Sequence, residues 1–294
     1  MNRKYTFLSS FWLKILAFTF MTIDHIGWLL EDNVGSNFWP VLPCRIIGRL
    51  ALPLFCFMIT EGVIHTRHFG KYASRLGIMA LIVMGTLIFV EYSGVFPDVH
   101  IRNEGNIFVD LLCGAAVVYF LKRKEVGLKF IALVPVIIAI FSFVANCLET
   151  NRSVTIHWFP FFLRMQYDWY SVLLCAGFFF AYTLKDWALE YHEKLTGLNK
   201  EYLEGSYLER NLTNVFAIGM LIVITMMLFL SSYIIGEAYT YWRPGLQNYA
   251  LFSGAFILLY NGKRGYNAKW FEYGSYLYYP IHLLLIFGIG MLVL

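Results

Sequence analysis

Apolar residues along this chain are grouped into long runs that polar segments separate. About nine of these runs are long enough, or nearly so, to cross the roughly 30 Å hydrocarbon core of a bilayer. Several are short and their ends are open, so the pattern predicts about eight to ten spans. We therefore expect an all-α, polytopic membrane bundle of about nine transmembrane helices, forming one domain over residues 1–294. The runs cover residues 11–30, 46–64, 76–92, 106–121, 130–147, 168–184, 213–235, 246–260 and 273–294.

The basic residues between the runs predict how the spans are oriented. An excess of lysine and arginine marks the cytoplasmic connections of a membrane protein. We therefore expect a multi-pass protein of the cell (cytoplasmic) membrane, with its N-terminus inside and its C-terminus outside. The first run is followed by acidic residues and not by a small-residue cleavage site, which favours a retained anchor. The basic residues gather in alternate connections, at 3–4, 67–75, 122–129, 185–210 and 263–269.

Composition supports the membrane interpretation and narrows the function. The chain is 59% hydrophobic and only 14% charged, which is more apolar than a soluble domain of this length. Its net charge of +4 does not indicate nucleic-acid binding, because the basic residues lie in short clusters between apolar runs. The five cysteines form no CxxC pair, so neither a metal site nor a disulfide framework is expected.

One connection, residues 185–212, has its own helical periodicity. Its apolar residues follow a 4-4-3-4 spacing, which keeps one face of a helix apolar. We expect a cytoplasmic amphipathic segment that lies along the inner leaflet. The residues in this pattern are Trp187, Tyr191, Leu195, Leu198 and Tyr202.

Ionisable residues inside the first apolar run are the strongest functional signal. Asp24 and His25 fall well within this run. A charge at bilayer depth costs at least a few kcal/mol, so such residues usually face a protein interior and mark a working site. Lys14 lies eleven positions before His25 and shares its helix face. Asp24 points about 100° away from His25 and needs another partner.

The second run offers that partner. Arg45 and Arg49 are four residues apart near its outer end, where the antiparallel connection brings them to the depth of Asp24. A purely structural ion pair is the simplest interpretation of the three residues.

Further along the same run, Glu61 approaches the inner face. Arg67, Lys71 and Arg75 follow it at intervals of four residues. If this segment is helical, it presents a basic ridge suited to phosphate groups in the cytosol. Ordinary positive-inside anchoring explains the same three residues.

Three other polar residues belong to later apolar runs. Asn106 and Asp110 are four residues apart and open the fourth run from outside, while His282 lies in the last run. Pro280 should kink that helix and free carbonyl groups toward a cavity. With the residues above, these side chains predict a cavity that holds acid–base groups.

Several of these residues belong to longer sequence patterns. The segments Thr22-Ile-Asp-His-Ile-Gly27, Arg45-Ile-Ile-Gly-Arg-Leu-Ala-Leu-Pro-Leu-Phe55 and Glu61-Gly-Val-Ile-His-Thr-Arg67 resemble the TraX family, membrane proteins linked to acetylation of conjugative pilin. The resemblance is strong over about residues 14–76, with a further match at the Tyr-Tyr-Pro-Ile-His282 ending. The Lys14-x10-His25 spacing is similar to a signature of the wider transmembrane acyltransferase superfamily, whose members transfer acetyl groups from acetyl-CoA across the bilayer.

The resemblance implies roles for individual residues. His25 corresponds to the essential first-span histidine and Lys14 to a basic residue near the cofactor. The superfamily's arginine pair has no unambiguous counterpart: the residues Arg67, Lys71 and Arg75 have the right depth for it, and the Arg45 and Arg49 pair does not.

The expected function is therefore that of an acetyl-CoA-dependent transmembrane acyltransferase. His25 would act as general base or acyl carrier, while Asp24 with Arg45 or Arg49 would orient the site. The acceptor would be a protein N-terminal amine, as in a pilin-like peptide, or a glycan hydroxyl.

Two other functions use the same residues. A proton-coupled transporter or flippase would employ Asp24, His25 and Glu61 as a proton relay without a cofactor. A haem protein would use His25 and His282 as axial ligands. Transport predicts flux through sealed vesicles without acetyl-CoA, whereas transfer predicts label moving from acetyl-CoA to an acceptor.

Overall fold

A computed structural model describes residues 6–35, 39–93, 105–152, 156–197, 207–236 and 243–293. Within these ranges the chain is helical, and its only strand-like feature is an isolated parallel bridge between Leu8 and Tyr260. The all-α bundle expected from the sequence is thus confirmed. The helices are α1 (Ser10–Val34), α2 (Val41–Gly48), α3 (Ala51–His65), α4 (Phe69–Ser93), α5 (Ile107–Leu121), α6 (Val126–Phe130), α7 (Leu133–Arg152), α8 (Asp168–Thr196), α9 (Tyr207–Ile235), α10 (Pro244–Gln247), α11 (Ser253–Leu258) and α12 (Lys269–Val293), with short 3-10 turns at Phe161–Leu163 and Asn248–Phe252.

Six segments of the described chain are long and apolar enough to cross a membrane. The protein is therefore a multi-pass helical membrane protein. Each predicted apolar run falls on helical structure, but the predicted count of about nine spans stays a prediction. The six segments are Ser10–Glu31, Val41–His65, Phe69–Phe89, Val126–Arg152, Phe161–Thr196 and Leu208–Ile235, and α5 is a shorter apolar helix.

The second of these segments is divided by Pro53. A proline has no N–H group, and its ring clashes with the carbonyl group four residues earlier, which here belongs to Arg49. The backbone tightens at this point, where the N–H groups of Arg49 and Leu50 donate to the carbonyl oxygens of Ile46 and Ile47, 3.2 Å away in both cases. One membrane segment is therefore built from two helices, α2 and α3.

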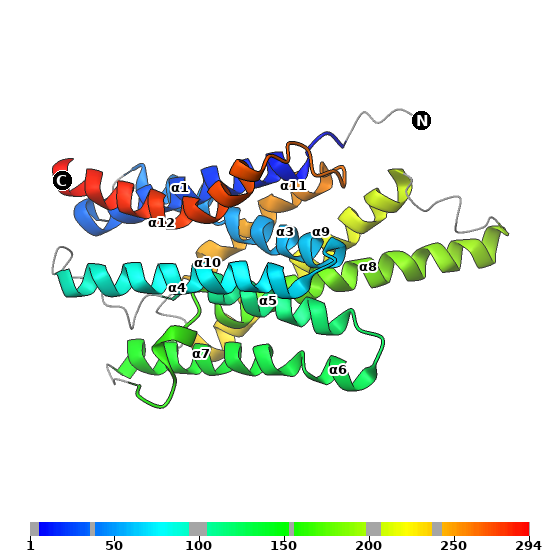
Figure 1. The fold of residues 1–294 in the computed structure, drawn as a ribbon, viewed down its shortest axis with the longest axis horizontal. Helices are drawn as coiled ribbons and strands as arrows, with labels where there is room; N and C mark the ends of the chain where they lie inside the picture. Colours follow the sequence, from blue (N-terminus) through cyan, green and yellow to red (C-terminus); the bar gives the residue numbers. More distant parts are fainter. Residues whose placement is uncertain are drawn as a thin grey trace.

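The helices pack around α5 and α8 (Figure 1). Helix α5 contacts α3, α4, α7 and α8, while α8 also packs along α9. On one side of this centre α1 packs against α2, α3 and α12; α6 and α7 lie on the opposite side of the picture. The aromatic rings of Phe57 on α3 and Phe178 on α8 meet edge to face at 5.4 Å in the core.

Helix α1 begins and α12 ends at opposite ends of the bundle (Figure 1). The α3–α4, α5–α6 and α11–α12 connections, which carry three of the basic segments, lie toward the end where α1 begins. Residues 3–4 and 198–206, which contribute to the other basic segments, are outside the described chain. Because α1 begins and α12 ends at opposite ends of the bundle, this arrangement fits an odd number of spans. Which end faces the cytosol stays a prediction.

The predicted interfacial segment 185–212 is divided between two helices. Helix α8 runs without a break to Thr196, and Gly197 caps it with the left-handed φ of 71° that favours glycine. Trp187, Tyr191 and Leu195 are exposed on this extension. Leu198 and Tyr202 are outside the described chain, so the place of this segment along the inner leaflet stays a prediction.

Candidate functional site

The candidate site is built on the contact between α1 and α12. The ring centroids of Phe11 and Phe271 lie 4.7 Å apart, and those of Phe18 and Tyr278 lie 4.5 Å apart. The contacts follow the same order along both helices, so α1 and α12 are parallel. The hydroxyl of Thr22 lies 2.6 Å from that of Tyr278.

Lys14 and His25 lie on this same face of α1. The ammonium of Lys14 sits 5.5 Å from the ring centroid of Phe271, and His25 contacts His282. The prediction that Lys14 and His25 share one helix face is therefore confirmed, with α12 as the helix that this face meets.

His25 and His282 form a buried hydrogen-bonded pair. Nδ1 of His25 lies 2.7 Å from Nε2 of His282, and the rings stack at 4.9 Å with 18° between their planes. Nδ1 of His282 lies 2.9 Å from the carbonyl oxygen of Tyr278. A carbonyl only accepts, so this nitrogen of His282 carries the hydrogen.

That contact assigns the proton positions of the pair. In neutral His282, Nε2 is then the acceptor, and the hydrogen between the rings belongs to Nδ1 of His25. Nε2 of His25 is left with a free lone pair. The pair thus holds His25 in the tautomer that a general base or nucleophile requires at Nε2.

A cavity of about 810 Å³ opens between α1, α3, α4, α5 and α12. Its basic part includes Arg67, Arg75 and Arg264. Lys14 lines it along α1, and Phe108 and Tyr279 belong to its apolar wall.

Tyr279 connects this cavity with the histidine pair. Its ring lines the cavity and meets the ring of Phe108 edge to face at 5.6 Å. The same ring meets that of His25 at 5.9 Å and that of His282 at 5.5 Å. His25 therefore lies one aromatic ring away from a cavity whose other part is basic.

The N-terminal segment holds the loop that contributes Arg264 to the cavity. The N–H groups of Ser10 and Phe11 donate to the carbonyl oxygens of Lys263 and Arg264, at 2.8 and 3.0 Å. Gly265 has a φ of +72° and lies so close to Ser9 that a side chain would overlap it. The loop is thereby fixed against the start of α1.

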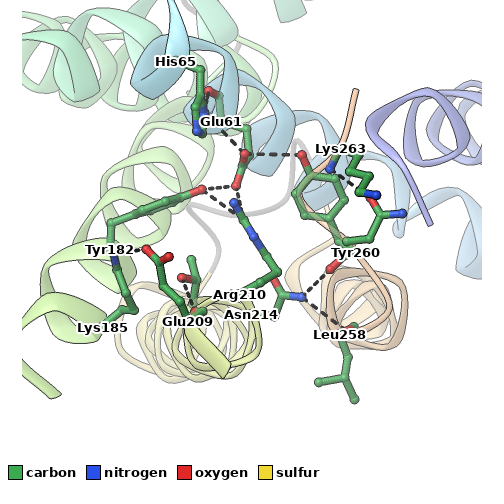
Figure 2. A network of polar contacts seen from close by, with 12 residues as sticks. Glu61, His65, Tyr182, Lys185, Glu209, Arg210, Asn214, Leu258, Tyr260 and Lys263 are labelled. Carbon is green, nitrogen blue, oxygen red and sulfur yellow. Dashed lines mark hydrogen bonds and ion pairs between the residues drawn. The ribbon is translucent and has the colours of Figure 1, made fainter. Parts of the chain in front are cut away.

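Two carboxylates line the cavity, and both have cationic partners. Glu272 of α12 pairs with Arg75 of α4. Glu61 of α3 accepts from Nη1 of Arg210 at 2.6 Å and from the hydroxyl of Tyr182 (Figure 2).

The hydroxyl of Tyr260 is a third donor to Glu61, at 3.3 Å. The guanidinium of Arg210 also lies over the rings of Tyr260 and Tyr182, at 5.2 and 5.9 Å from their centroids. These four side chains, which we call the Glu61 network, join α3, α8, α9 and the segment that follows α11 (Figure 2).

Sequence reasoning missed three members of this network. Arg210 was interpreted only as one of the basic residues on the inner face. A lone arginine just before the apolar run 213–235 could have indicated a buried charge that needs a partner. Tyr182 and Tyr260 carry no signal, because tyrosine is common throughout this chain. Arg264 of the cavity was likewise treated only as an anchoring charge.

Asp24 takes the partners predicted for it. Its Oδ1 lies 3.0 Å from Nη1 of Arg45 and 2.5 Å from Nη2 of Arg49, which confirms the expected ion pair. Nε of Arg45 also lies 3.4 Å from Glu31, which in turn pairs with Arg243 at 2.7 Å. We call these five residues the Asp24 cluster.

Two glycines make this cluster possible. A Cβ at Gly48 would overlap the side chain of Asp24, and one at Gly27 would lie 2.7 Å from Cβ of Cys44. Glycine at both positions lets α1 and α2 approach closely enough for Asp24 to reach both arginines. The glycines of the Thr22–Gly27 and Arg45–Phe55 patterns therefore have a packing role.

Among the predicted cavity or cofactor residues that lie outside the cavity lining, four have structural roles elsewhere. Arg45 and Arg49 belong to the Asp24 cluster. Asn106 caps α5 by accepting from the N–H of Phe108 at 3.0 Å, and Asp110 accepts from the N–H groups of Gln166 and Tyr167. The placement of these four residues in the cavity is thus corrected: their polar groups are used to hold helices and loops together.

The predicted basic ridge is also corrected. Helix α3 ends at His65 and α4 begins at Phe69, with Thr66 in an extended conformation. Arg67 lies in this connection, so Arg67, Lys71 and Arg75 do not follow one continuous helix. Arg67 and Arg75 line the cavity, whereas Lys71 does not. Glu61 lines it as predicted, and His282 reaches it through the ring of Tyr279.

Fold and site together define a multi-pass helical membrane protein with a buried histidine pair beside a basic cavity. The family model described as TraX protein matches residues 9–198, and the chain belongs to this family. The matched region runs from the start of α1 beyond the end of α8, and it includes His25 and the Asp24 cluster except for Arg243.

Two relatives match shorter parts of the chain. It is 40% identical over 82 residues to the probable fimbrial assembly protein FimC, serogroup H1, of Dichelobacter nodosus, a match covering 28% of this chain and 32% of that protein. It is 28% identical over 114 residues to the uncharacterized protein RP591 of Rickettsia prowazekii (strain Madrid E), covering 38% and 37%. These matches span about a third of each relative. No solved structure matches the chain.

Proposed function

We propose that this protein is an acetyl-CoA-dependent membrane transferase in which His25 acts on the acceptor. The observation that carries the proposal is Tyr279, whose ring belongs both to the basic cavity and to the surroundings of His25. A basic cavity that ends beside a buried imidazole suits a donor with a phosphate-rich end and a reactive far end.

The residues of the cavity fit acetyl-CoA. The volume of about 810 Å³ falls within the roughly 300–1,000 Å³ typical of ligand sites. Arg67, Arg75 and Arg264 would hold the phosphates, because guanidinium groups bind phosphate with paired hydrogen bonds. Lys14 would contact the donor between these arginines and Tyr279. When bound, acetyl-CoA supplies an acetyl group activated as a thioester.

His25 would supply the proton transfer. Its Nε2 would take the proton from an acceptor amine or hydroxyl as that group attacks the thioester carbonyl, and would return the proton to the CoA sulfur as the C–S bond breaks, while Nδ1 keeps its hydrogen bond to His282. His282 acts here as a positioning residue, because it fixes the tautomer and orientation of His25. The same lone pair would let His25 carry the acetyl group covalently, and a trapped acetyl-histidine would separate this route from direct proton transfer.

The acceptor and the membrane side are also part of the proposal. A relative bears the name of a probable fimbrial assembly protein, which supports a pilin-like peptide with a free N-terminal amine as acceptor. A glycan hydroxyl at the outer side is the other acceptor class that this chemistry serves. We place the protein in the cytoplasmic membrane with its N-terminus inside, so that the basic cavity meets cytosolic acetyl-CoA.

The first test uses purified protein with acetyl-CoA labelled in the acetyl group. We expect the protein to bind acetyl-CoA and to release label slowly to water without an acceptor, and His25→Ala to abolish release while keeping its helicity by circular dichroism. Loss of binding in Arg67→Gln/Arg264→Gln would support the phosphate assignment. Absence of acetyl-CoA binding, with proton-coupled flux in sealed vesicles, would replace this function by transport.

The second test concerns His282. We expect His282→Phe, which keeps a ring but has no acceptor for Nδ1 of His25, to lower kcat by about 10²–10⁴-fold with little change in KM. His282→Gln offers a side-chain oxygen as acceptor and should recover much of that loss. If His282 only fills space, His282→Phe will retain more activity than His282→Gln. That result would contradict the positioning role.

A further inference from the structure

A second cavity lies on another side of the bundle. It measures about 430 Å³ and is bounded by the end of α5, the α5–α6 connection, Lys129 of α6 and the middle of α8. Its lining shares no residue with that of the first cavity. The residues that give it its character are Lys122, Arg123, Lys124, Lys129, Phe179 and Phe180.

The charge of this cavity is unbalanced. Four of its lining residues are cationic and none is a carboxylate. The first cavity differs, because Glu61 and Glu272 offset its cations. Four cations around one small cavity repel one another unless an anion neutralises them. The second cavity therefore has the charge of an anion-binding site.

Two of the four cations are fixed in place by the protein. Nζ of Lys122 donates to the carbonyl oxygen of Ile64 at 2.5 Å, which holds it against the end of α3. Arg123 hydrogen-bonds to the hydroxyl of Tyr119 and lies over its ring at 4.4 Å. Their side chains are ordered before any ligand arrives, which lowers the entropy lost on binding.

The other two cations remain available. Lys124 and Lys129 are exposed and form no ion pair with the described part of the chain. Lys124 lies in the connection between α5 and α6, and Lys129 lies in α6. An anion held between them would meet two exposed ammonium groups and the two hydrogen-bonded cations.

The remaining wall of the cavity is apolar and belongs to α8. Phe179 packs on the core, and Phe180 is 48% exposed on a helix that crosses the membrane. Leu121, the last residue of the apolar helix α5, directly precedes the cations. Apolar surface and cationic groups thus adjoin where a membrane helix ends, which is the depth of lipid head groups.

We propose that this cavity binds the head group of an anionic phospholipid. The phosphate would lie among Lys122, Arg123, Lys124 and Lys129, and an acyl chain would lie along Phe180. Basic pockets between membrane helices favour anionic lipid head groups for this reason. A free phosphate ion would use the cations and leave the phenylalanine wall uncovered. The proposal is independent of the transferase function.

The test compares two double variants in native mass spectrometry after exposure to equal amounts of phosphatidylglycerol and phosphatidylcholine. Lys124→Gln/Lys129→Gln removes the two exposed cations of the cavity that form no ion pair with the described chain. Lys263→Gln/Lys269→Gln removes the same charge from the α11–α12 connection and the first residue of α12, outside both cavities. Circular dichroism checks that both variants keep their helicity.

We expect the parent protein to retain phosphatidylglycerol in preference to phosphatidylcholine, and the cavity variant to bind it about 30-fold more weakly. The control variant should change little. Phe180→Ser should weaken lipid retention as well, and excess inorganic phosphate should not displace the lipid. Equal loss in both double variants would indicate general surface charge and overturn the proposal. Displacement by inorganic phosphate, with no effect of Phe180→Ser, would overturn it in favour of a phosphate-ion site.

Discussion

Asp24 and Glu61 are both buried carboxylates, yet the protein surrounds them differently. Asp24 meets two guanidinium groups, those of Arg45 and Arg49. Glu61 meets one guanidinium, that of Arg210, together with two tyrosine hydroxyls and the imidazole of His65, whose Nδ1 lies 3.6 Å from Oε2. At the centre of the Asp24 cluster, two cations surround one carboxylate. In the Glu61 network one carboxylate faces one guanidinium, and neutral hydroxyl groups donate further hydrogen bonds.

The difference indicates two uses of a buried charge. The ion pairs of Asp24 with Arg45 and Arg49 join α1 to the neighbouring helix α2 and its C-cap, so they fix the helix that carries His25. The Glu61 network joins segments far apart in the chain and faces a cavity that would receive phosphates. Neutralising Glu61 with Arg210 keeps that cavity wall from repelling an anionic donor. One network orients a helix, and the other sets the potential of a cavity.

We expect the largest loss of stability from a substitution at Asp24. Asp24→Asn keeps the size of the side chain but leaves Arg45 and Arg49 as buried cations without their counter-charge. We expect a loss of about 3–5 kcal/mol in the free energy of unfolding, because breaking a buried ion pair leaves an uncompensated charge. The measurement is the unfolding transition in mixed micelles of mild detergent and dodecyl sulfate. A loss below about 1 kcal/mol would place the pair among solvent-screened surface pairs.

A smaller effect is expected at Arg210. Arg210→Gln removes the cation, but the hydroxyls of Tyr182 and Tyr260 still donate to Glu61. We expect a loss of about 1.5–3 kcal/mol, the range for one hydrogen bond to a charged group. The same variant should bind acetyl-CoA more weakly, because an unbalanced Glu61 would face its phosphates.

Glu61→Gln/Arg210→Gln is the matched double variant. It removes both charges, so it should be more stable than the sum of the two single losses predicts, by about 0.5–3 kcal/mol. Additive losses would show that the two side chains do not interact in solution, and the charge-balance interpretation of the cavity would then be wrong.

The same contrast explains what the sequence could predict. Asp24 lies 21 and 25 residues before its arginines, and two consecutive antiparallel helices must bring these positions together. Glu61 lies 149 residues before Arg210, and hydrophobic periodicity shows which face points inward but not which helix it meets. The helical class, the Asp24 ion pair and the shared face of Lys14 and His25 were therefore predictable, while the Glu61 network was not.

Two further examples show what the sequence alone did not reveal about the site. His25 and His282 were both singled out, but their contact depends on α1 and α12 being neighbours across 257 residues. Asn106 was assigned to a cavity because it lies four residues before Asp110, whereas it caps a helix. An asparagine directly before an apolar helix is a common N-cap residue, and this signal was not used in the sequence-based prediction.

The smallest loss expected from a single substitution concerns the glycines between α1 and α2. Gly48→Ala places a methyl group where the side chain of Asp24 lies, so either the helices separate or Asp24 leaves its arginines. We expect a loss of about 1–3 kcal/mol in the free energy of unfolding, the usual cost of overpacking.

Gly77→Ala is the matched control, because nothing lies within 4 Å of a Cβ at that position of α4. It should gain about 0.4–1 kcal/mol by restricting the unfolded chain. Adding Asp24→Asn to Gly48→Ala separates packing from charge. If the alanine acts by displacing Asp24 from Arg45 and Arg49, its cost should shrink once the carboxylate is gone. An unchanged cost would mean that Gly48 serves only the close approach of α1 and α2, and that the Asp24 cluster tolerates a shift of its backbone.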